Sequence, residues 1–296
     1  MRRVEYFAGT NKIGQSSAPN FAFAWNAAPA GVHLLTARAV DDCDDGTVSA
    51  PVLVRVGTAT LVPTGATWKY LDNGSDQGVA WRAPGFNDAA WAAGPGQLGF
   101  GDSDEATVIN GGPATNRFIT TYFRRSLFVP NAAQVTGLFA RLLRDDGAVV
   151  YLNGIEVFRS NMPTGAITHT TLSSTAVGGV DESAFFLNSI SVEPLVSGTN
   201  VLAVEVHQSA NNSSDLGFDL ELIAALPPAL GIAATPGGHL LRWPSASAGY
   251  SLFSKASLNP LVNWQRVNAA PTDDGSWKTL LLPSTGAAKF YRLSTE

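Results

Sequence analysis

The segment Arg144–Val157 constrains the fold more than any other part of this chain of 296 residues. Two adjacent carboxylates, Asp145 and Asp146, precede a run of apolar residues that ends at Asn153-Gly154. Asn-Gly is the strongest short signal for a β-hairpin, because both central residues of a type I′ turn need a positive φ. The segment therefore predicts a strand, a tight turn and a returning strand, with an acidic pair at the mouth of the first strand.

This acidic pair has two interpretations. Carboxylate oxygens are ligands for a hard cation such as calcium, and a bound cation can chelate sugar hydroxyls. Alternatively, Asp145, Asp146 and Gly147 form a surface turn, where aspartate is favoured because its side chain bonds to the nearby backbone. The sequence leaves both interpretations open.

The composition excludes several classes of protein. Hydrophobic residues make up 45% of the chain, which is enough for a packed core and argues against wholesale disorder. Charged residues are only 15%, the net charge is −5 and no basic stripe is present, so a nucleic-acid partner is not expected. No run of about 18 apolar residues exists, so no membrane span is expected. Cys43 is the only cysteine, which excludes an intrachain disulfide and a cysteine-based metal site.

Short alternating segments recur along the chain, separated by Gly, Pro, Asn and Asp, and long helical periodicity is absent. This pattern predicts an all-β protein made of β-sandwich domains. Three units are expected, over residues 1–57, 58–226 and 229–296. The stiff Pro227-Pro228 pair separates the last two.

The first unit contains Val4–Gly9, Ala24-Trp25 and Thr36–Asp42. These motifs resemble the last two thirds of the bacterial Ig-like repeats of secreted multidomain proteins. The strands that precede them in such a repeat are missing, which would leave an unpaired edge and an exposed core. We therefore expect Met1 to lie within a longer natural protein. The first residues lack the apolar segment of a signal peptide, and the resemblance implies a secreted or cell-surface location.

The middle unit contains Tyr122–Arg125, Asp145–Gly154 and Asn200–Val206. These motifs resemble a galactose-binding-like jelly roll, as in the sugar-binding domain of β-galactosidase-type enzymes. The Asp-Asp-Gly sequence is also similar to lectin domains of the anthrax-protective-antigen type, in which neighbouring aspartates hold calcium and the calcium holds sugar. The resemblance implies a polysaccharide or oligosaccharide partner and calcium as the cofactor.

The last unit resembles the small fibronectin-like C-terminal units of secreted bacterial proteins. Its strand signals include Leu240–Trp243 and Phe290–Leu293. We expect Trp243, Trp264 and Trp277 in the core or on strand faces, because tryptophan is usually well buried. A stacking platform for sugar is the alternative.

The carbohydrate interpretation places ligand contacts on the aspartate pair, on aromatic rings and on the polar loop that follows strand 201–207. Amide and hydroxyl groups on such a loop suit sugar hydroxyls, although a solvated loop fits the same composition. The candidate ligand-binding residues are Asp145, Asp146, Trp81, Tyr151, His207, Gln208, Asn211 and Asn212.

Two further acidic loops are candidates for calcium. Gly101–Glu105 carries three carboxylates that would repel each other unless they were solvated or bound to a cation. The candidate metal ligands are Asp102, Asp104, Asp145 and Asp146. The cluster Asp41–Asp45 lacks EF-hand spacing and is interpreted as a solvated turn.

A glycoside hydrolase is the alternative function, since two suitably spaced carboxylates suffice for that chemistry. The candidate catalytic residues are Asp145, Asp146, Glu182, Glu205 and Asp219. If strands 201–207 and 218–222 lie in one sheet, Glu205 and Asp219 share a polar surface with His207 and Glu221. Against this, Glu205 would form a structural ion pair with Arg124 or Arg144. A third interpretation is a structural spacer without ligand or turnover, and no hydrolase, nucleotide or zinc motif is present.

Overall fold

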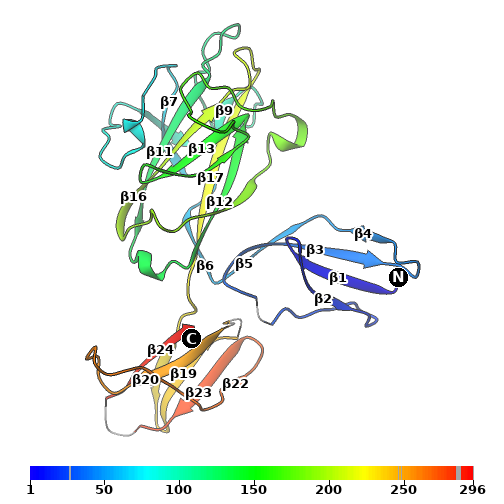
Figure 1. Cartoon of the computed structure of the whole chain (residues 1–296), viewed down its shortest axis with the longest axis vertical. Coiled ribbons are helices and arrows are strands. Elements are labelled where there is room, and N and C mark those ends of the chain that lie inside the picture. Colours follow the sequence, from blue (N-terminus) through cyan, green and yellow to red (C-terminus); the bar gives the residue numbers. More distant parts are fainter. Residues whose placement is uncertain (27, 246, 248, 285–287, 296) are drawn as a thin grey trace. The chain divides into compact units, whose positions relative to one another are not determined.

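The computed structural model describes residues 1–26, 28–245, 247, 249–284 and 288–295. Regular structure in these ranges is almost entirely β, which confirms the all-β prediction, and contacts divide the chain into two compact units (Figure 1). Unit 1 combines residues 1–58 and 225–296, and unit 2 is residues 59–224. Within the described ranges, no helix is long and apolar enough to cross a membrane. The helical turns are η1 (Ala80–Arg82), η2 (Ala132–Gln134) and η3 (Gly179–Asp181).

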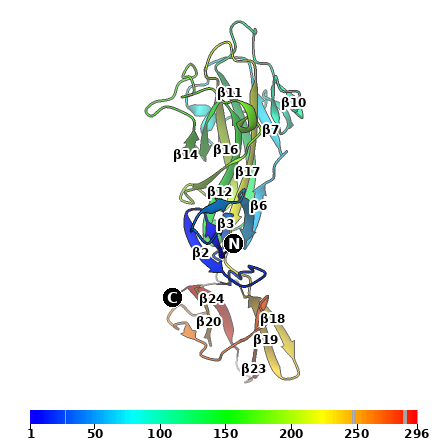
Figure 2. The same cartoon turned by 90° about the vertical axis from the view of Figure 1, so that its right-hand side faces the viewer.

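Unit 2 is a β-sandwich of two sheets (Figures 1 and 2). The first, called the β17 sheet, has the order β10-β9-β17-β12-β15, with β6 also paired to β17. Its strands are β6 (Thr58–Val62), β9 (Leu98–Phe100), β10 (Thr107–Val108), β12 (Gly137–Asp145), β15 (Phe186–Ile190) and β17 (Leu216–Ala225).

The second sheet, called the β16 sheet, has the order β14-β13-β16-β11-β7-β8. The predicted hairpin is present in it as β13 and β14, and Asn153 and Gly154 have φ values of 52° and 87°. Both positive φ angles match the Asn-Gly signal. The strands are β7 (Thr67–Leu71), β8 (Ala92–Pro95), β11 (Thr120–Val129), β13 (Gly147–Leu152), β14 (Ile155–Ser160) and β16 (Gly198–His207).

Aromatic side chains join the two sheets of unit 2. Phe123 of β11 stacks on Phe218 of β17 with ring centroids 4.1 Å apart, and Trp68 of β7 meets Phe218 edge-on at 5.1 Å. All three side chains are fully buried. Aromatic pairs of this geometry add directional attraction to a large buried apolar area, so they fix how the sheets face each other.

The outer face of the β16 sheet is also covered. The segment around η1 places Trp81 against Tyr122 and Tyr151, with ring centroids 4.8 and 5.8 Å apart. These residues form a second apolar cluster with Val149 and Ala203. Both faces of the central strand β16 are therefore buried, which explains why its alternating polar residues do not reach solvent.

Strands β16 and β17 belong to different sheets. Glu205 and His207 therefore lie on the β16 sheet, whereas Asp219 and Glu221 lie on the β17 sheet. The shared polar surface that would form if these strands were neighbours is absent, because the sandwich topology separates successive strands of the chain.

Unit 1 contains an N-terminal sheet of order β2-β1-β3-β4, with β5 paired to β3, and two smaller sheets from its C-terminal part. The smaller sheets have the orders β18-β19-β23-β22 and β21-β20-β24. Leu241, Trp243, Leu252 and Leu280 form the apolar core of the C-terminal part. Trp264 is half-buried and Trp277 is exposed on a strand face.

The strands of unit 1 are β1 (Arg3–Ala8), β2 (Asn11–Ser16), β3 (Gly31–Val40), β4 (Gly46–Val48), β5 (Val52–Val56), β18 (Gly231–Thr235), β19 (Gly238–Pro244), β20 (Tyr250–Lys255), β21 (Gln265–Arg266), β22 (Thr272–Asp273), β23 (Trp277–Leu282) and β24 (Phe290–Thr295).

The packing of β11 predicts unequal effects for two phenylalanines on that strand. Phe123→Ala removes a fully buried ring and should lower the free energy of unfolding by about 3–5 kcal/mol. Phe128→Ala changes a ring that is 68% exposed and should alter it by less than about 0.5 kcal/mol. Urea unfolding followed by tryptophan fluorescence measures both, and equal effects would contradict the assigned core.

Candidate cation site

Three strand ends of the β17 sheet bring carboxylates together. Asp102 follows β9, Asp145 is the last residue of β12 and Asp215 directly precedes β17. The strands are neighbours in the order β9-β17-β12, and Leu216 pairs with Phe100. One carboxylate oxygen from each aspartate lies within 4.8 Å of the other two. These residues are called the three-aspartate cluster.

A glycine holds the Asp102 loop against the Asp215 loop. Gly101 has a φ of +114°, and a Cβ on it would lie 2.6 Å from the Cβ of Asp215. Only glycine accepts both this backbone conformation and this close approach. The sequence at Gly101-Asp102 is thus needed to place the Asp102 carboxylate beside Asp215.

Asp145 is buried within the cluster without hydrogen-bond partners. Its side chain is 1% exposed, and neither carboxylate oxygen has a hydrogen-bond partner among the residues described. Burial, followed by the neighbouring charge of Asp146, raises the pKa of Asp145 to about 9. An ionised carboxylate in such a place is costly unless a positive charge compensates it.

Asp102 is an exposed residue, but its carboxyl is partly desolvated and lies among other carboxylates. Burial, followed by the charges of Asp215 and Glu182, raises the pKa of Asp102 to about 6. The charge of Glu182 also raises the pKa of Asp145. The negative field at this end of the sheet therefore comes from several carboxylates at once, and a cation placed among them would lower the pKa values of Asp102 and Asp145.

The donor set fits calcium. Besides the three carboxylates, Gln208 is buried, its Oε1 has no hydrogen-bond partner in the described ranges, and its Nε2 donates to the carbonyl of Asp215 at 2.8 Å. Calcium takes six to eight oxygen ligands at about 2.3–2.6 Å. Zinc and copper prefer nitrogen or sulfur ligands, which this cluster does not offer.

The adjacent Asp146 has a different role from Asp145. Its Oδ1 accepts a hydrogen bond from the backbone N–H of Val177 at 2.6 Å, and its Oδ2 accepts one from Ser209 at 2.7 Å. Its own carbonyl accepts from Asn161 at 2.9 Å. Asp145 and Asp146 are 1% and 2% exposed, so the interpretation of this segment as a surface turn is wrong. Asp146 ties two loops to the end of β12, because a buried carboxylate with backbone donors is a stable anchor.

The loop 101–105 carries a second acidic group. Carboxylate oxygens of Asp102, Asp104 and Glu105 also lie within 4.8 Å of one another, and these side chains are exposed or half-buried. Glu105 accepts from the backbone N–H of Asp102 at 3.0 Å, and Asp104 accepts from Gln97 at 3.1 Å. Water can solvate these exposed carboxylates, so this group has less need of a cation than the buried Asp145.

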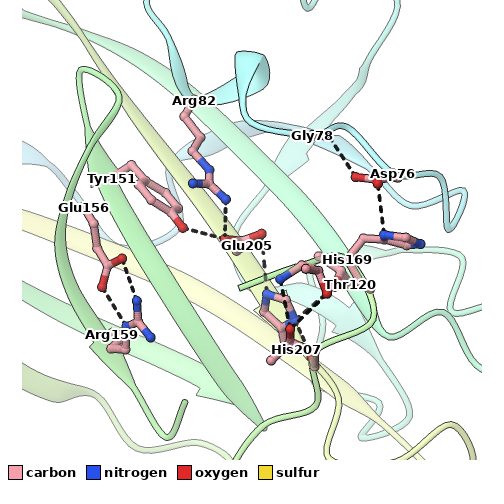
Figure 3. Close-up of polar contacts among 12 residues, drawn as sticks. Asp76, Gly78, Arg82, Thr120, Tyr151, Glu156, Arg159, His169, Glu205 and His207 are labelled. Atoms are coloured by element: carbon pink, nitrogen blue, oxygen red, sulfur yellow. Dashed lines mark hydrogen bonds and ion pairs between the residues drawn. The ribbon is translucent and has the colours of Figure 1, made fainter. Parts of the chain in front are cut away.

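Glu205 lies in a separate buried network on the β16 sheet (Figure 3). Its Oε1 accepts from the hydroxyl of Tyr151 at 2.6 Å and from Arg82 at 3.2 Å, and its Oε2 lies 3.5 Å from Nε2 of His207. Nδ1 of His207 donates to the carbonyl of Thr171 at 2.7 Å. Burial acts to raise the pKa of Glu205, but His207, Tyr151 and Arg82 outweigh it and hold that pKa below the usual value.

The ion pair of Glu205 is made with Arg82 rather than with the cross-strand arginines expected from the sequence. Arg124 instead pairs with Asp88 at 2.9 Å, and Arg144 donates to the hydroxyl of Ser160 at 3.0 Å. The segment before β8 packs on the outer face of the β16 sheet and places Arg82 beside Glu205. A contact between residues so far apart in the sequence cannot be predicted from the pairing of neighbouring strands.

The remaining candidates fall into two groups. Trp81 and Tyr151 belong to the apolar cluster beside Glu205, and Asp219 accepts from the backbone N–H groups of Gly65 and Leu220, each at 2.8 Å. Asn211 and Asn212 are exposed in the loop between Gln208 and Asp215. The structure thus brings Asp102 and Asp145 together with Asp215, bonds Gln208 to the carbonyl of Asp215, and places the two asparagines on the same loop as Asp215. Asp104 is exposed and Glu182 is half-buried, and the other candidates lie in the interior.

Asp215 was not among the metal ligands expected from the sequence. It ends the polar loop and precedes a strand, as the Asp145-Asp146 pair does. This position directly before a strand was the sequence feature that could have identified Asp215 as a candidate metal ligand. The pairing of β9 with β17, which brings Asp215 to Asp102, could not be obtained from local pattern.

No protein-family model and no curated protein matches the chain. Solved structures similar to it include a β-glucuronidase from Bacteroides uniformis, at 15% identity and a TM-score of 0.40, covering 80% of this chain and 28% of that one. A calcium-binding mutant of Bacteroides uniformis β-glucuronidase 2 is also similar, at 15% identity and a TM-score of 0.37. The match covers 80% of this chain and 28% of that one. A β-glucuronidase from glycoside hydrolase family 2 is similar at 13% identity and a TM-score of 0.39, and the match covers 82% of this chain and 27% of that one.

This chain therefore spans less than a third of the length of each of these enzymes. Identities and TM-scores this low do not carry an activity from those enzymes to this chain, since one fold hosts many functions.

The two neighbouring aspartates should respond oppositely to substitution in metal-free protein at pH 8. Asp146→Asn replaces an acceptor of a backbone N–H with a donor and should lower the free energy of unfolding by about 1–3 kcal/mol. Asp145→Asn removes an uncompensated carboxyl and should leave that free energy unchanged or raised. Chemical denaturation in excess chelator measures both. A loss for Asp145→Asn as large as for Asp146→Asn would contradict the assignment.

The raised pKa values predict how the stability of metal-free protein depends on pH. Asp145 and Asp102 have folded-state pKa values of about 9 and about 6, above the ordinary 3.8. The folded protein then retains protons that the unfolded chain releases, so stability is highest below about pH 4 for these groups and falls as pH rises towards 9. Thermal unfolding in chelator from pH 5 to 9 tests this, using Asp145→Asn as the control with a weaker fall. A pH dependence identical in both proteins would contradict it.

Proposed function

We propose that unit 2 is a calcium-dependent carbohydrate-binding module of a secreted or cell-surface protein. One observation carries the calcium part: the buried, unpartnered carboxylate of Asp145 lies within 4.8 Å of oxygens from Asp102 and Asp215. A divalent cation at this position supplies the positive charge that the cluster lacks. Extracellular calcium is abundant enough to fill sites of modest affinity.

Support for carbohydrate comes from the coordination chemistry and from the adjoining loop. Three monodentate aspartates leave several of the six to eight positions of calcium for other oxygens. Vicinal sugar hydroxyls are suitable ligands for those positions. Asn211 and Asn212 lie exposed on the same loop as Asp215 and provide amide groups for further hydroxyls.

The glycoside hydrolase alternative has weaker support from the geometry. Asp146, Glu205 and Asp219 are each at most 4% exposed, and all accept internal hydrogen bonds. A catalytic pair must reach the glycosidic oxygen and the anomeric carbon of a substrate. These carboxylates are instead used to hold the sandwich together. A structural spacer without ligand remains the outcome if neither calcium nor sugar binds.

Calcium should bind with a stoichiometry of one at the three-aspartate cluster. Saturation at a hundred times the dissociation constant should stabilise unit 2 by about 2.7 kcal/mol, because only the folded state offers the site. Asp145→Asn and Asp215→Asn should each abolish this, whereas Asp104→Asn should retain it. Calorimetry and thermal unfolding measure the effect. If Asp104→Asn lost calcium binding and Asp215→Asn retained it, the calcium site would instead lie in the exposed loop 101–105.

Sugar binding is tested on a panel of polysaccharides with calcium and with chelator. Retention of at least one polysaccharide in calcium, and its release by chelator, is the expected result. Asn211→Ala combined with Asn212→Ala should weaken sugar retention while leaving calcium binding intact. Calcium binding without retention of any polysaccharide would contradict the carbohydrate part of the proposal and leave a structural calcium site. A separate screen with chromogenic glycosides tests the glycoside hydrolase alternative.

A further inference from the structure

The C-terminal part of unit 1 contains a cavity of about 380 Å³. Trp243 of β19 and Lys278 of β23 line it from one sheet, and Tyr250 and Leu252 of β20 line it from the other. The segment 266–271 forms its rim. The volume falls within the range of pockets that hold small molecules, about 300–1,000 Å³.

Lys278 lies on the core-facing side of its strand. In the register of the sheet it is opposite Trp243, just as Leu280 is opposite Leu241. Trp243, Leu241 and Leu280 are buried, and residues two apart on a strand share a face. Lys278 is therefore the charged end of a row of inward-facing side chains.

Within the described ranges the ammonium of Lys278 has no hydrogen bond and no ion pair within 4 Å, although its charge helps to hold the pKa of Asp273 below the ordinary value. The nearest acidic neighbour in the register is Asp273 of β22. The carboxylate of Asp273 accepts from the hydroxyl of Ser245 and from the backbone N–H of Gly275 at 2.9 Å. No Asp or Glu is among the described residues that line the cavity, whereas Arg266 stands on the rim. Lys278 is thus the lining side chain that can offer a positive charge to a ligand in the cavity.

The floor of the cavity is apolar and its rim is polar. Trp243 and Leu252 are 3% and 5% exposed, and Val267 packs against the same cluster. The backbone N–H of Val267 donates to the carbonyl of Leu252 at 2.8 Å, which anchors the rim segment. Tyr250 and Asn268 are also lining residues, and their side chains carry a hydroxyl and an amide that can form hydrogen bonds.

We propose that this cavity binds a sugar acid, with its carboxylate paired to Lys278 and its hydroxyls bonded at the rim. A carboxylate matches the ammonium of Lys278, which has no hydrogen bond within the described ranges, because charge-assisted hydrogen bonds are the strong ones. A hydroxylated body matches a small cavity whose lining carries a phenol and an amide. This site lies in unit 1 and needs no calcium, so it is independent of the function proposed for unit 2.

Saturation-transfer NMR on the full chain in excess chelator tests the proposal with galacturonate, a galacturonate trimer and galactose. Galacturonate should give a saturable signal. The affinity for galactose should be lower by a factor of about ten or more, as expected for loss of a charge-assisted hydrogen bond. The trimer distinguishes a free sugar acid from a chain end: equal or tighter binding of the trimer supports a polysaccharide source, and binding of galacturonate alone supports a free one.

Lys278→Met should weaken galacturonate binding to the level of galactose, and Lys278→Arg should restore part of it. Lys255→Met is the matched control, because Lys255 lies over the ring of Trp264 outside the cavity, and it should bind as the unaltered protein does. Circular dichroism checks that each variant is folded. No saturable signal, equal binding of galactose and galacturonate, or undiminished binding by a folded Lys278→Met would overturn the proposal.

Discussion

The buried carboxylate of Asp145 is the constraint on which the account of unit 2 depends. It is surrounded by other carboxylates, and neither of its oxygens has a hydrogen-bond partner in the part of the chain that the structure describes. Proteins rarely keep such a group unless it binds something or is protonated. If Asp145 binds a cation, this end of the sandwich is a cation site. If Asp145 is instead protonated, its burial lowers the stability of the folded protein at neutral pH.

Unit 2 contains three kinds of buried carboxylate, and their surroundings separate their roles. Glu205 is compensated by Arg82, Tyr151 and His207, so its pKa is held low. Asp146 is satisfied by backbone N–H groups and joins loops. Asp145 alone among these three lacks donors, and its pKa is raised by burial and by the charge of Asp146. The site is therefore marked by a deficit of hydrogen bonds rather than by an abundance of acidic residues.

The sequence predicted the features that depend on local pattern. Short alternating runs gave the all-β class, and Asn153-Gly154 gave the β13–β14 hairpin with its two positive φ angles. Asp145 was recognised as a candidate ligand because an acidic pair precedes a predicted strand, and Asp102 because three carboxylates crowd the loop 101–105. Trp243 was recognised as a core residue.

Other features depend on contacts between distant parts of the chain. The placement of Asp215 requires the pairing of β9 with β17, and the burial of Glu205 requires η1 to fold over the β16 sheet. The separate roles of Asp145 and Asp146 depend on backbone donors at Val177 and Ser209, which no spacing rule indicates. Local periodicity carries no information on any of these.

The most direct test of the account is a crystal structure of the full chain grown with calcium, with anomalous diffraction to identify the ion. Calcium coordination by the three-aspartate cluster predicts one anomalous peak between Asp102, Asp145 and Asp215, with carboxylate oxygens at about 2.3–2.6 Å from it. An empty cluster at saturating calcium, with the Asp145 carboxyl protonated and bonded to Asp146, would contradict it.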